Sequence, residues 1–301
     1  MQKGIDGFLD YLRYERNRSE NTVESYRRDL EAFECYFSTL DSELTFATVD
    51  TDIVRDWMEY MLEQGNRATS VARRLSALKT YYRYLLARGY VEHDPAHIVY
   101  RPKTDRPLPQ FVREEQMDQL LDHTEWGDTY EAQLERTIVL MFYETGMRLS
   151  ELTSLNDSSV DYVRSEIRVH GKGNKQRAIP FGSELAEALR SYTVLRDAEV
   201  AHKNTTALFR TQRGGRMTNP QVREIVRRQL SIVTNLKKRS PHVLRHTFAT
   251  AMFNNGANIE NVQKLLGHER LSTTEIYTHT SFEQLKQAYS EAHPRSGTPQ
   301  E

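Results

Sequence analysis

His242 and Arg245 have the residue types and the spacing to act together on an anionic group. Ser240 and Pro241 fit the N-cap and the first position of a helix, which places His242 at its start and Arg245 one turn later on the same face. Gly256 ends this helix. An imidazole can exchange a proton near neutral pH, and a guanidinium offers a planar fork of donors. These local signals do not show which other side chains face the pair.

Tyr277 lies beyond a second helix-ending signal in the same region. A helix that ends at Gly267 is followed directly by His268, and Ser272 with Glu275 fits a capping box that places Tyr277 in the first turns of the next helix. A phenol has a reference pKa of about 10, so it needs a base or a cationic field to act as a nucleophile near neutral pH. Taken alone, a tyrosine at this place is more often a packing residue.

The histidines also raise the question of a metal site. His242 and His246 are four residues apart, but the chain has no His-Glu-x-x-His pattern and no cysteine pair, so we expect no metal. Cys35 is the only cysteine, which excludes an intramolecular disulfide and fits a reducing compartment. We expect Cys35 to be a small core residue rather than a nucleophile.

Charge is distributed unevenly along a chain whose formal net charge is −1. Residues 65–91 hold six basic residues and no acidic one, and residues 203–245 hold eleven basic residues against Glu224 alone. Residues 107–162 have the opposite charge balance, with twelve acidic residues against three arginines. Two basic segments in different parts of the chain favour a nucleic-acid partner over the alternative of solvated helix faces.

Eight basic residues are predicted to contact DNA phosphates. They lie in the two basic segments and in a lysine-rich turn between strands, and are Arg67, Arg73, Arg74, Lys79, Lys175, Arg177, Arg216 and Arg223. Tyr81 and Tyr84, beside the first group, could contact sugars or could pack in the core, and the second alternative is favoured.

The pattern of apolar residues predicts a mainly α fold with a small antiparallel β-sheet (α+β). Residues 1–100 read as helices, with capping signals at Asn21 and at Thr69 or Ser70. Four prolines within residues 94–109 predict a linker, placed at 101–110. Residues 111–301 form a second domain, in which alternating apolar residues at 160–169 and 178–180 flank a Gly-Lys-Gly-Asn turn and predict a β-hairpin.

The chain carries no sign of a membrane protein or a secreted one. It has no run of about 18 apolar residues, and its first residues lack the apolar core of a signal peptide. We expect a cytoplasmic protein.

Five sequence blocks, in this order, resemble the tyrosine recombinase (phage-integrase) family. They are Thr145-Gly-Met-Arg-Leu-Ser-Glu-Leu152, Gly171-Lys-Gly-Asn-Lys175, His242-Val-Leu-Arg-His-Thr-Phe-Ala-Thr250, Leu265-Leu-Gly-His268 and Ile276-Tyr-Thr-His279. Each block alone is weak, but the ordered set is specific, and the tyrosine stands nine residues beyond the histidine of the Gly-His pair. The resemblance covers the whole chain, because residues 1–100 look like the family's helical, SAM-like core-binding domain.

The resemblance implies a catalytic set for cutting and rejoining DNA through a 3′-phosphotyrosyl link. Its members are the nucleophile Tyr277 together with Arg148, Lys172, His242, Arg245 and His268. Two guanidiniums would bind the non-bridging oxygens of the phosphate under attack. His242 would accept the phenol proton, Lys172 would protonate the leaving 5′-oxygen, and His268 would donate a hydrogen bond to the phosphate. Exchanging one phosphate ester for another needs no nucleotide cofactor, and the sequence has no P-loop.

The resemblance also implies partners. The ending Ala292-His-Pro-Arg295 is most similar to XerC/XerD-type recombinases, which implies double-stranded DNA at a specific site, a homo- or heterotetramer with a second recombinase, and a DNA translocase as activator. The role would be chromosome dimer resolution or mobile-element integration and excision. Phe282, Leu285 and Tyr289 share a helix face that would dock on a neighbouring protomer, the alternative being its own domain.

Two other functions remain open at this point. A type IB topoisomerase would share the nicking chemistry but would act as a monomer and relax DNA without a specific site. A catalytically silent DNA-binding regulator would keep the fold but not the chemistry, and the intact set of six residues argues against it.

Overall fold

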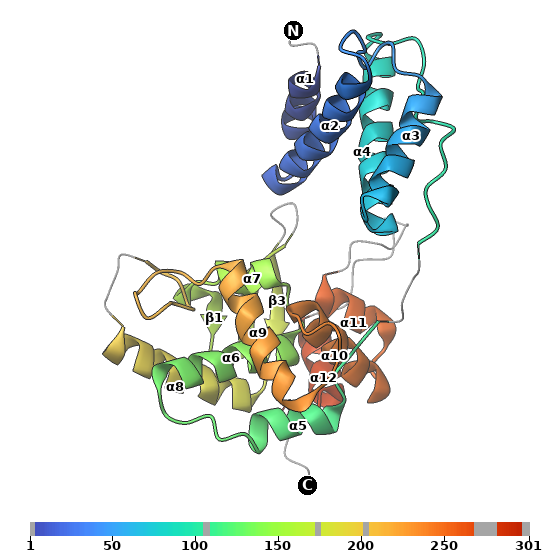
Figure 1. Cartoon of the computed structure of the whole chain (residues 1–301). Helices are drawn as coiled ribbons and strands as arrows, with labels where there is room; N and C mark the ends of the chain where they lie inside the picture. Colours follow the sequence, from blue (N-terminus) through green and yellow to red (C-terminus); the bar gives the residue numbers. More distant parts are fainter. Residues whose placement is uncertain (1–3, 105–108, 172–175, 201–204, 268–281, 297–301) are drawn as a thin grey trace. The chain divides into compact units, whose positions relative to one another are not determined.

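The computed structural model describes residues 4–104, 109–171, 176–200, 205–267 and 282–296. The chain forms two compact units, Met1–Pro107 and Leu108–Glu301, and each is described here by itself (Figure 1). The division between them falls inside the predicted linker 101–110.

The N-terminal unit is a helical bundle around an aromatic core. Its elements are α1 (Ile5–Asp10), the π-helical turn η1 (Tyr11–Glu15), α2 (Glu20–Leu40), α3 (Thr51–Glu63) and α4 (Ala68–Ala87). Phe33 of α2 and Trp57 of α3 are almost fully buried, with ring centres 4.7 Å apart. Tyr81 and Tyr84 of α4 are also buried in this core, so they pack as the favoured alternative predicted.

Three local expectations in this unit were wrong. α2 begins at Glu20 after Ser19 rather than at Asn21, and α4 begins at Ala68 rather than at Thr69 or Ser70. Cys35 is exposed, because the buried stripe of α2 includes Phe33 and Phe37 and a residue two positions from either lies on the other side of the helix.

The C-terminal unit is built around one buried helix. Its helices are α5 (Glu114–Asp122), α6 (Tyr130–Thr145), α7 (Leu149–Ser154), the 3-10 turn η2 (Asp157–Ser159), α8 (Ser183–Glu199), α9 (Asn219–Val233), α10 (Pro241–Asn254), α11 (Ile259–Leu266) and α12 (Phe282–Ala292). Every residue of α6 from Thr137 to Thr145 is buried, as expected of a helix surrounded by others. Helices α8, α9 and α10 pack against it (Figure 1).

A three-stranded antiparallel sheet completes this unit. Strands β1 (Val160–Asp161), β2 (Glu166–His170) and β3 (Gln176–Pro180) lie in the order β1-β2-β3. Ile167 pairs with Ile179 and Val169 with Arg177, which buries one apolar face. The sheet and the mainly α content confirm the predicted fold class, and the hairpin tip at 172–175 lies outside the described residues.

Helix α12 docks on its own unit. Tyr289 is buried and donates a hydrogen bond of 2.9 Å to Glu144 Oε2, and burial raises the pKa of that carboxyl group to about 8. His293 lies 3.1 Å from the carbonyl oxygen of Tyr143. The face of α12 that was predicted to dock on a neighbouring protomer consists of Phe282, Leu285 and Tyr289. Tyr289 is covered within the chain, and Phe282 and Leu285 are half-buried.

Gly146 ends α6 and turns the chain into α7, and we predict that it tolerates no side chain. Its φ is +56°, and an added Cβ would lie 2.5 Å from Phe248 Cδ1 and 2.8 Å from Leu266 Cδ2. Gly146→Ala should cost about 1–2 kcal/mol of unfolding free energy for the left-handed backbone, and about 1–3 kcal/mol more for overpacking.

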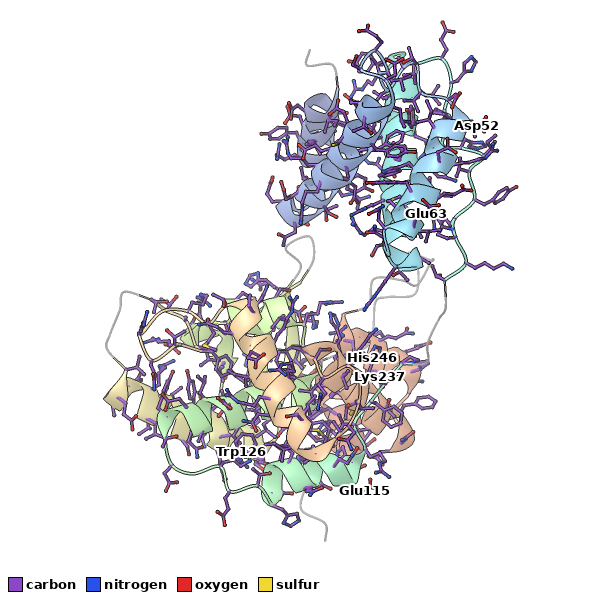
Figure 2. The ribbon with its side chains drawn as sticks, in the orientation of Figure 1. Asp52, Glu63, Glu115, Trp126, Lys237 and His246 are labelled. Carbon is purple, nitrogen blue, oxygen red and sulfur yellow. The ribbon has the colours of Figure 1, made fainter. Side chains whose placement is uncertain are left out.

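Gly256 supplies the matched control, because its φ is +88° but nothing lies within 4 Å of an added Cβ. Urea unfolding can be followed through Trp126, which lies beside α5 in the same unit (Figure 2). Gly256→Ala should show the backbone cost alone, and equal losses for the two variants would contradict the packing argument.

Candidate active site

Arg245 is the most buried of the predicted catalytic residues that the structure describes. It stands on α10 with 8% of its surface exposed, and its guanidinium donates 2.7 Å hydrogen bonds to the carbonyl oxygens of Gly146 and Leu266. Burial, followed by repulsion from Arg148, lowers its pKa to about 10. The group therefore remains a cation at neutral pH, in a fixed orientation.

Arg148 lies at the N-terminus of α7, two residues after the left-handed turn at Gly146. Its Nη2 donates to the carbonyl oxygen of Gly267 at 2.7 Å, and its Nη1 donates to Glu151 Oε1 at 2.9 Å. The other oxygen of Glu151 accepts from the main-chain N–H of Arg148 at 2.7 Å. The side chain remains about a third exposed, so a substrate can reach it.

The C-terminal end of α11 holds both of these arginines and a third. The carbonyl oxygens of residues 265–267 accept, in order, from Arg177 Nε at 3.0 Å, Arg245 Nη2 at 2.7 Å and Arg148 Nη2 at 2.7 Å. The last carbonyls of a helix lack partners within the helix and carry the negative end of its dipole, so cations are favoured there. Three guanidiniums are thus fixed side by side at the point where the chain continues to His268.

His242 starts α10 one turn before Arg245 and is exposed. Crowding by surrounding protein and then the positive charges of Arg245, His246 and Arg223 lower the pKa of His242 below its usual value. The ring is therefore more often neutral at neutral pH, the form that can accept a proton. His246, the next turn of α10, is marked in Figure 2.

The structure brings three members of the predicted set together: Arg148, His242 and Arg245. The other three, Lys172, His268 and Tyr277, lie outside the described residues, as does Lys175. Their roles remain predictions.

Several residues that were predicted to contact DNA form contacts within the protein. Arg73 pairs with Asp29, and Arg74 donates to Met61 Sδ. Arg216 donates to the carbonyl oxygens of Thr153 and Leu155, at the end of α7. Lys79 donates to a main-chain carbonyl 3.1 Å away, whereas Arg67 and Arg223 are exposed. Arg177 is bound to Glu151 and α11.

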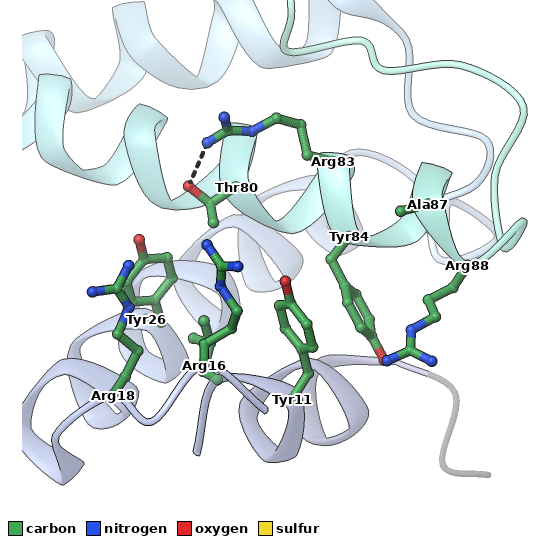
Figure 3. Close-up of a pocket in the computed structure, with 10 residues that line it drawn as sticks. Tyr11, Arg16, Arg18, Tyr26, Thr80, Arg83, Tyr84, Ala87 and Arg88 are labelled. Carbon is green, nitrogen blue, oxygen red and sulfur yellow. Dashed lines mark hydrogen bonds between the residues drawn. The ribbon is translucent and has the colours of Figure 1, made fainter. Parts of the chain in front are cut away.

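A pocket in the N-terminal unit shows basic residues that the sequence analysis missed. It has a volume of about 440 Å³ between η1, α2 and α4, and it combines arginines with the rings of Tyr11, Tyr26 and Tyr84 (Figure 3). Arg16 and Arg18 are exposed there and form no ion pair with the described residues. Arg16 and Arg18 lie outside the basic segment 65–91, so charge counting along the chain did not find them.

The described residues contain no cluster of three or more histidine, cysteine, aspartate or glutamate residues able to hold a metal. Among the same residues, no helix has the length and hydropathy needed to cross a membrane.

Both units match known families. Residues 110–284 match the phage integrase family, and residues 5–89 match the phage integrase N-terminal SAM-like domain. The chain belongs to the phage integrase family of tyrosine recombinases. Together with relatives named tyrosine recombinase XerC, this membership confirms the predicted enzyme class, a site-specific DNA strand transferase, and the resemblance to XerC/XerD-type recombinases.

Relatives and solved structures extend the match over nearly the full chain. The chain is 38% identical to tyrosine recombinase XerC of Oceanobacillus iheyensis, covering 97% of this chain and 96% of the relative. It is 39% identical to XerC of Azotobacter vinelandii, covering 98% and 97%. The structure of the XerH site-specific recombinase bound to its difH substrate covers 95% of this chain and 83% of the other, with a TM-score of 0.68 and 23% identity. The Tn1549 transposon integrase in complex with circular intermediate DNA covers 94% and 97%, with a TM-score of 0.71 and 20% identity.

We predict that Arg245→Lys slows DNA strand cleavage about 10²–10³-fold, the usual cost of losing one fixed oxyanion donor. Lysine keeps the charge but cannot reach two carbonyl oxygens and a phosphate in one plane. The rate is measured in a single turnover on a nicked suicide substrate. Arg190→Lys, at an exposed arginine of α8, is the matched control and should leave the rate unchanged. A wild-type rate for Arg245→Lys would contradict the assigned geometry.

Proposed function

We propose that this enzyme cuts and rejoins DNA through a 3′-phosphotyrosyl link formed by Tyr277. The observation that carries the proposal is the pair of guanidiniums, Arg148 and Arg245, fixed by the main-chain carbonyls at the end of α11. Two planar cations held side by side match the two non-bridging oxygens of a phosphodiester. Their orientation is set by the protein, so little reorganisation is needed when charge develops on the phosphate.

The strand transfer then follows in two chemically similar steps. Tyr277 Oη attacks the phosphorus, His242 accepts the phenol proton, and the bond to the 5′-oxygen breaks as Lys172 protonates that oxygen. His268 donates a hydrogen bond to the phosphate. In the second step a 5′-hydroxyl of another strand attacks the phosphotyrosyl bond and releases Tyr277. One ester replaces another in each step, so the reaction needs no nucleotide cofactor.

We further propose that the biological role is chromosome dimer resolution in the cytoplasm. Relatives named XerC at 35–39% identity over nearly the whole chain support this role over mobile-element integration. The enzyme would act on a specific duplex site as a tetramer, with a second recombinase and a DNA translocase as partners. Residues 1–100 would be its core-binding domain, 101–110 its linker and 111–301 its catalytic domain.

The half-buried Phe282 of α12 would meet the neighbouring protomer in that tetramer, while Leu285 packs against the apolar cluster of its own unit. Tyr289, already covered within the chain, would anchor the helix to its own unit.

Tyr277→Phe tests the chemistry. A nicked suicide substrate should trap a covalent protein–DNA adduct with the wild-type enzyme, because the released fragment cannot return, and none with the phenylalanine variant. The adduct is detected by its reduced mobility in a denaturing gel. An adduct formed by Tyr277→Phe would overturn the assignment, and relaxation of a plasmid that lacks any recombination site would favour a type IB topoisomerase.

We also propose that the arginines of the pocket in Figure 3 bind DNA phosphates. The salt dependence of DNA binding tests this proposal. Each neutralised phosphate contributes about −0.9 to the slope of log K against log salt concentration. Replacing Arg16, Arg18 and Arg83 together by alanine should therefore make the slope about 2.7 units less steep. Arg55→Ala on α3, at an exposed arginine paired with Asp52, is the control and should leave the slope unchanged. An unchanged slope for the triple variant would exclude this pocket as a phosphate-binding surface.

A further inference from the structure

All three nitrogens of the Arg177 guanidinium, on β3, donate hydrogen bonds within the protein. Nη1 and Nη2 donate to the two oxygens of Glu151 at 2.6 and 2.8 Å, and Nε donates to the carbonyl oxygen of Leu265 at 3.0 Å. The side chain is 15% exposed. A two-point guanidinium–carboxylate pair of this kind is short and directional. Arg177 was predicted to contact DNA phosphates, and in the structure three of its five N–H donors bond to Glu151 and Leu265.

Glu151 connects Arg177 to the catalytic arginine Arg148. The carboxylate is 2% exposed and accepts from Arg177 and from both the side chain and the main chain of Arg148. Burial alone would raise its pKa, but the hydrogen bonds and charge of Arg177, with those of Arg148, hold the pKa of Glu151 below its usual value. Glu151 is thus a buried anion shared by two cations.

This sharing determines how much positive charge Arg148 can offer a substrate. With Arg148, Arg177 and Arg245 against Glu151, the cluster carries three positive charges and one negative charge. Without Arg177, the Glu151 carboxylate would be balanced mainly by Arg148 and would draw that guanidinium toward itself. A buried carboxylate that loses one partner interacts more strongly with the one that remains.

Arg177 also lies against the corner that ends α11. A Cβ added at Gly267 would be 2.9 Å from Arg177 Nη1 and 3.1 Å from its Cζ, so the guanidinium occupies the space beside this residue. Gly267 has a φ of +66° and passes the chain to His268. Arg177 lies opposite Val169 in the β-sheet, and its side chain bonds to Glu151 of α7 and to Leu265 of α11. One side chain therefore connects the hairpin, α7 and the end of α11.

We propose that Arg177 is a positioning residue for strand cleavage. Its ion pair with Glu151 weakens the attraction of that carboxylate for Arg148, so the Arg148 guanidinium stays directed at the phosphate. Its hydrogen bond to Leu265 fixes the end of α11, from which the chain continues to His268. Arg177 itself does not touch the DNA. The inference rests on the proposed function, since it concerns the rate of the same cleavage step.

The experiment compares cleavage with binding in Arg177→Lys and Arg177→Met. Single-turnover cleavage of the suicide substrate is measured with all DNA bound, and the dissociation constant and its salt slope are measured separately. We expect Arg177→Met to slow cleavage of the bound complex by about 10- to 100-fold, as for other partners that orient a catalytic group. Affinity and salt slope should not change. Arg177→Lys should also be slow, since one ammonium cannot bind both oxygens of Glu151 and the Leu265 carbonyl together.

Arg168→Met is the matched control on the neighbouring strand. Arg168 pairs with Glu166 and Asp161, is about half exposed and makes no contact with α11 among the described residues, so its replacement should leave the cleavage rate unchanged. A salt slope that becomes less steep by about 0.9 in Arg177→Met would instead mark Arg177 as a phosphate contact and overturn the proposal.

Two readouts separate positioning from a loss of folded protein. A merely structural role would lower the fraction of enzyme that reacts, whereas a positioning role lowers the rate constant at full amplitude. Methylguanidine added to Arg177→Ala should restore part of the rate without changing affinity. A wild-type rate constant in Arg177→Lys would overturn the proposal even if the methionine variant does not fold. Failure of the wild-type enzyme to form an adduct would instead reject the proposed function.

Discussion

The C-terminal carbonyls of α11 are the constraint on which the active-site geometry depends. The last carbonyl oxygens of a helix lack N–H partners within it, and those of residues 265–267 accept hydrogen bonds from Arg177, Arg245 and Arg148 in that order. These arginines come from β3, α10 and the start of α7, so the end of one helix holds together three segments that are distant in the sequence. Three cations so close together repel one another. The helix dipole and the buried Glu151 offset that repulsion.

A count of basic residues along the sequence does not show which of them bond within the protein. The basic segment 203–245 includes the buried Arg210, which pairs with Asp157, and Arg216, which donates to carbonyl oxygens at the end of α7. Exposed arginines without an ion pair among the described residues, such as Arg16 and Arg18, instead lie outside the segments with the highest basic content. A cation's burial and partners decide whether it can meet a phosphate.

Local signals predicted the helix ends around the site well, because each depends on neighbouring residues alone. Ser240 and Pro241 mark the start of α10, and Gly267 is the left-handed residue that ends α11. Long-range contacts could not be predicted this way. The carboxylate that binds Arg177 is 26 residues distant along the chain, and nothing in the local sequence pairs the two. The docking of Tyr289 on Glu144 depends on a separation of 145 residues in the same way.

The central claim is that the protein fixes its catalytic guanidiniums before DNA binds. Nitrogen-15 spectra of the arginine side chains in the DNA-free enzyme test this most directly, with assignments from single lysine variants. The account predicts separate, slowly exchanging Nη signals for Arg148, Arg177 and Arg245, because each guanidinium is hydrogen-bonded to fixed acceptors. Averaged signals typical of freely rotating guanidiniums, becoming ordered only when DNA is added, would contradict it.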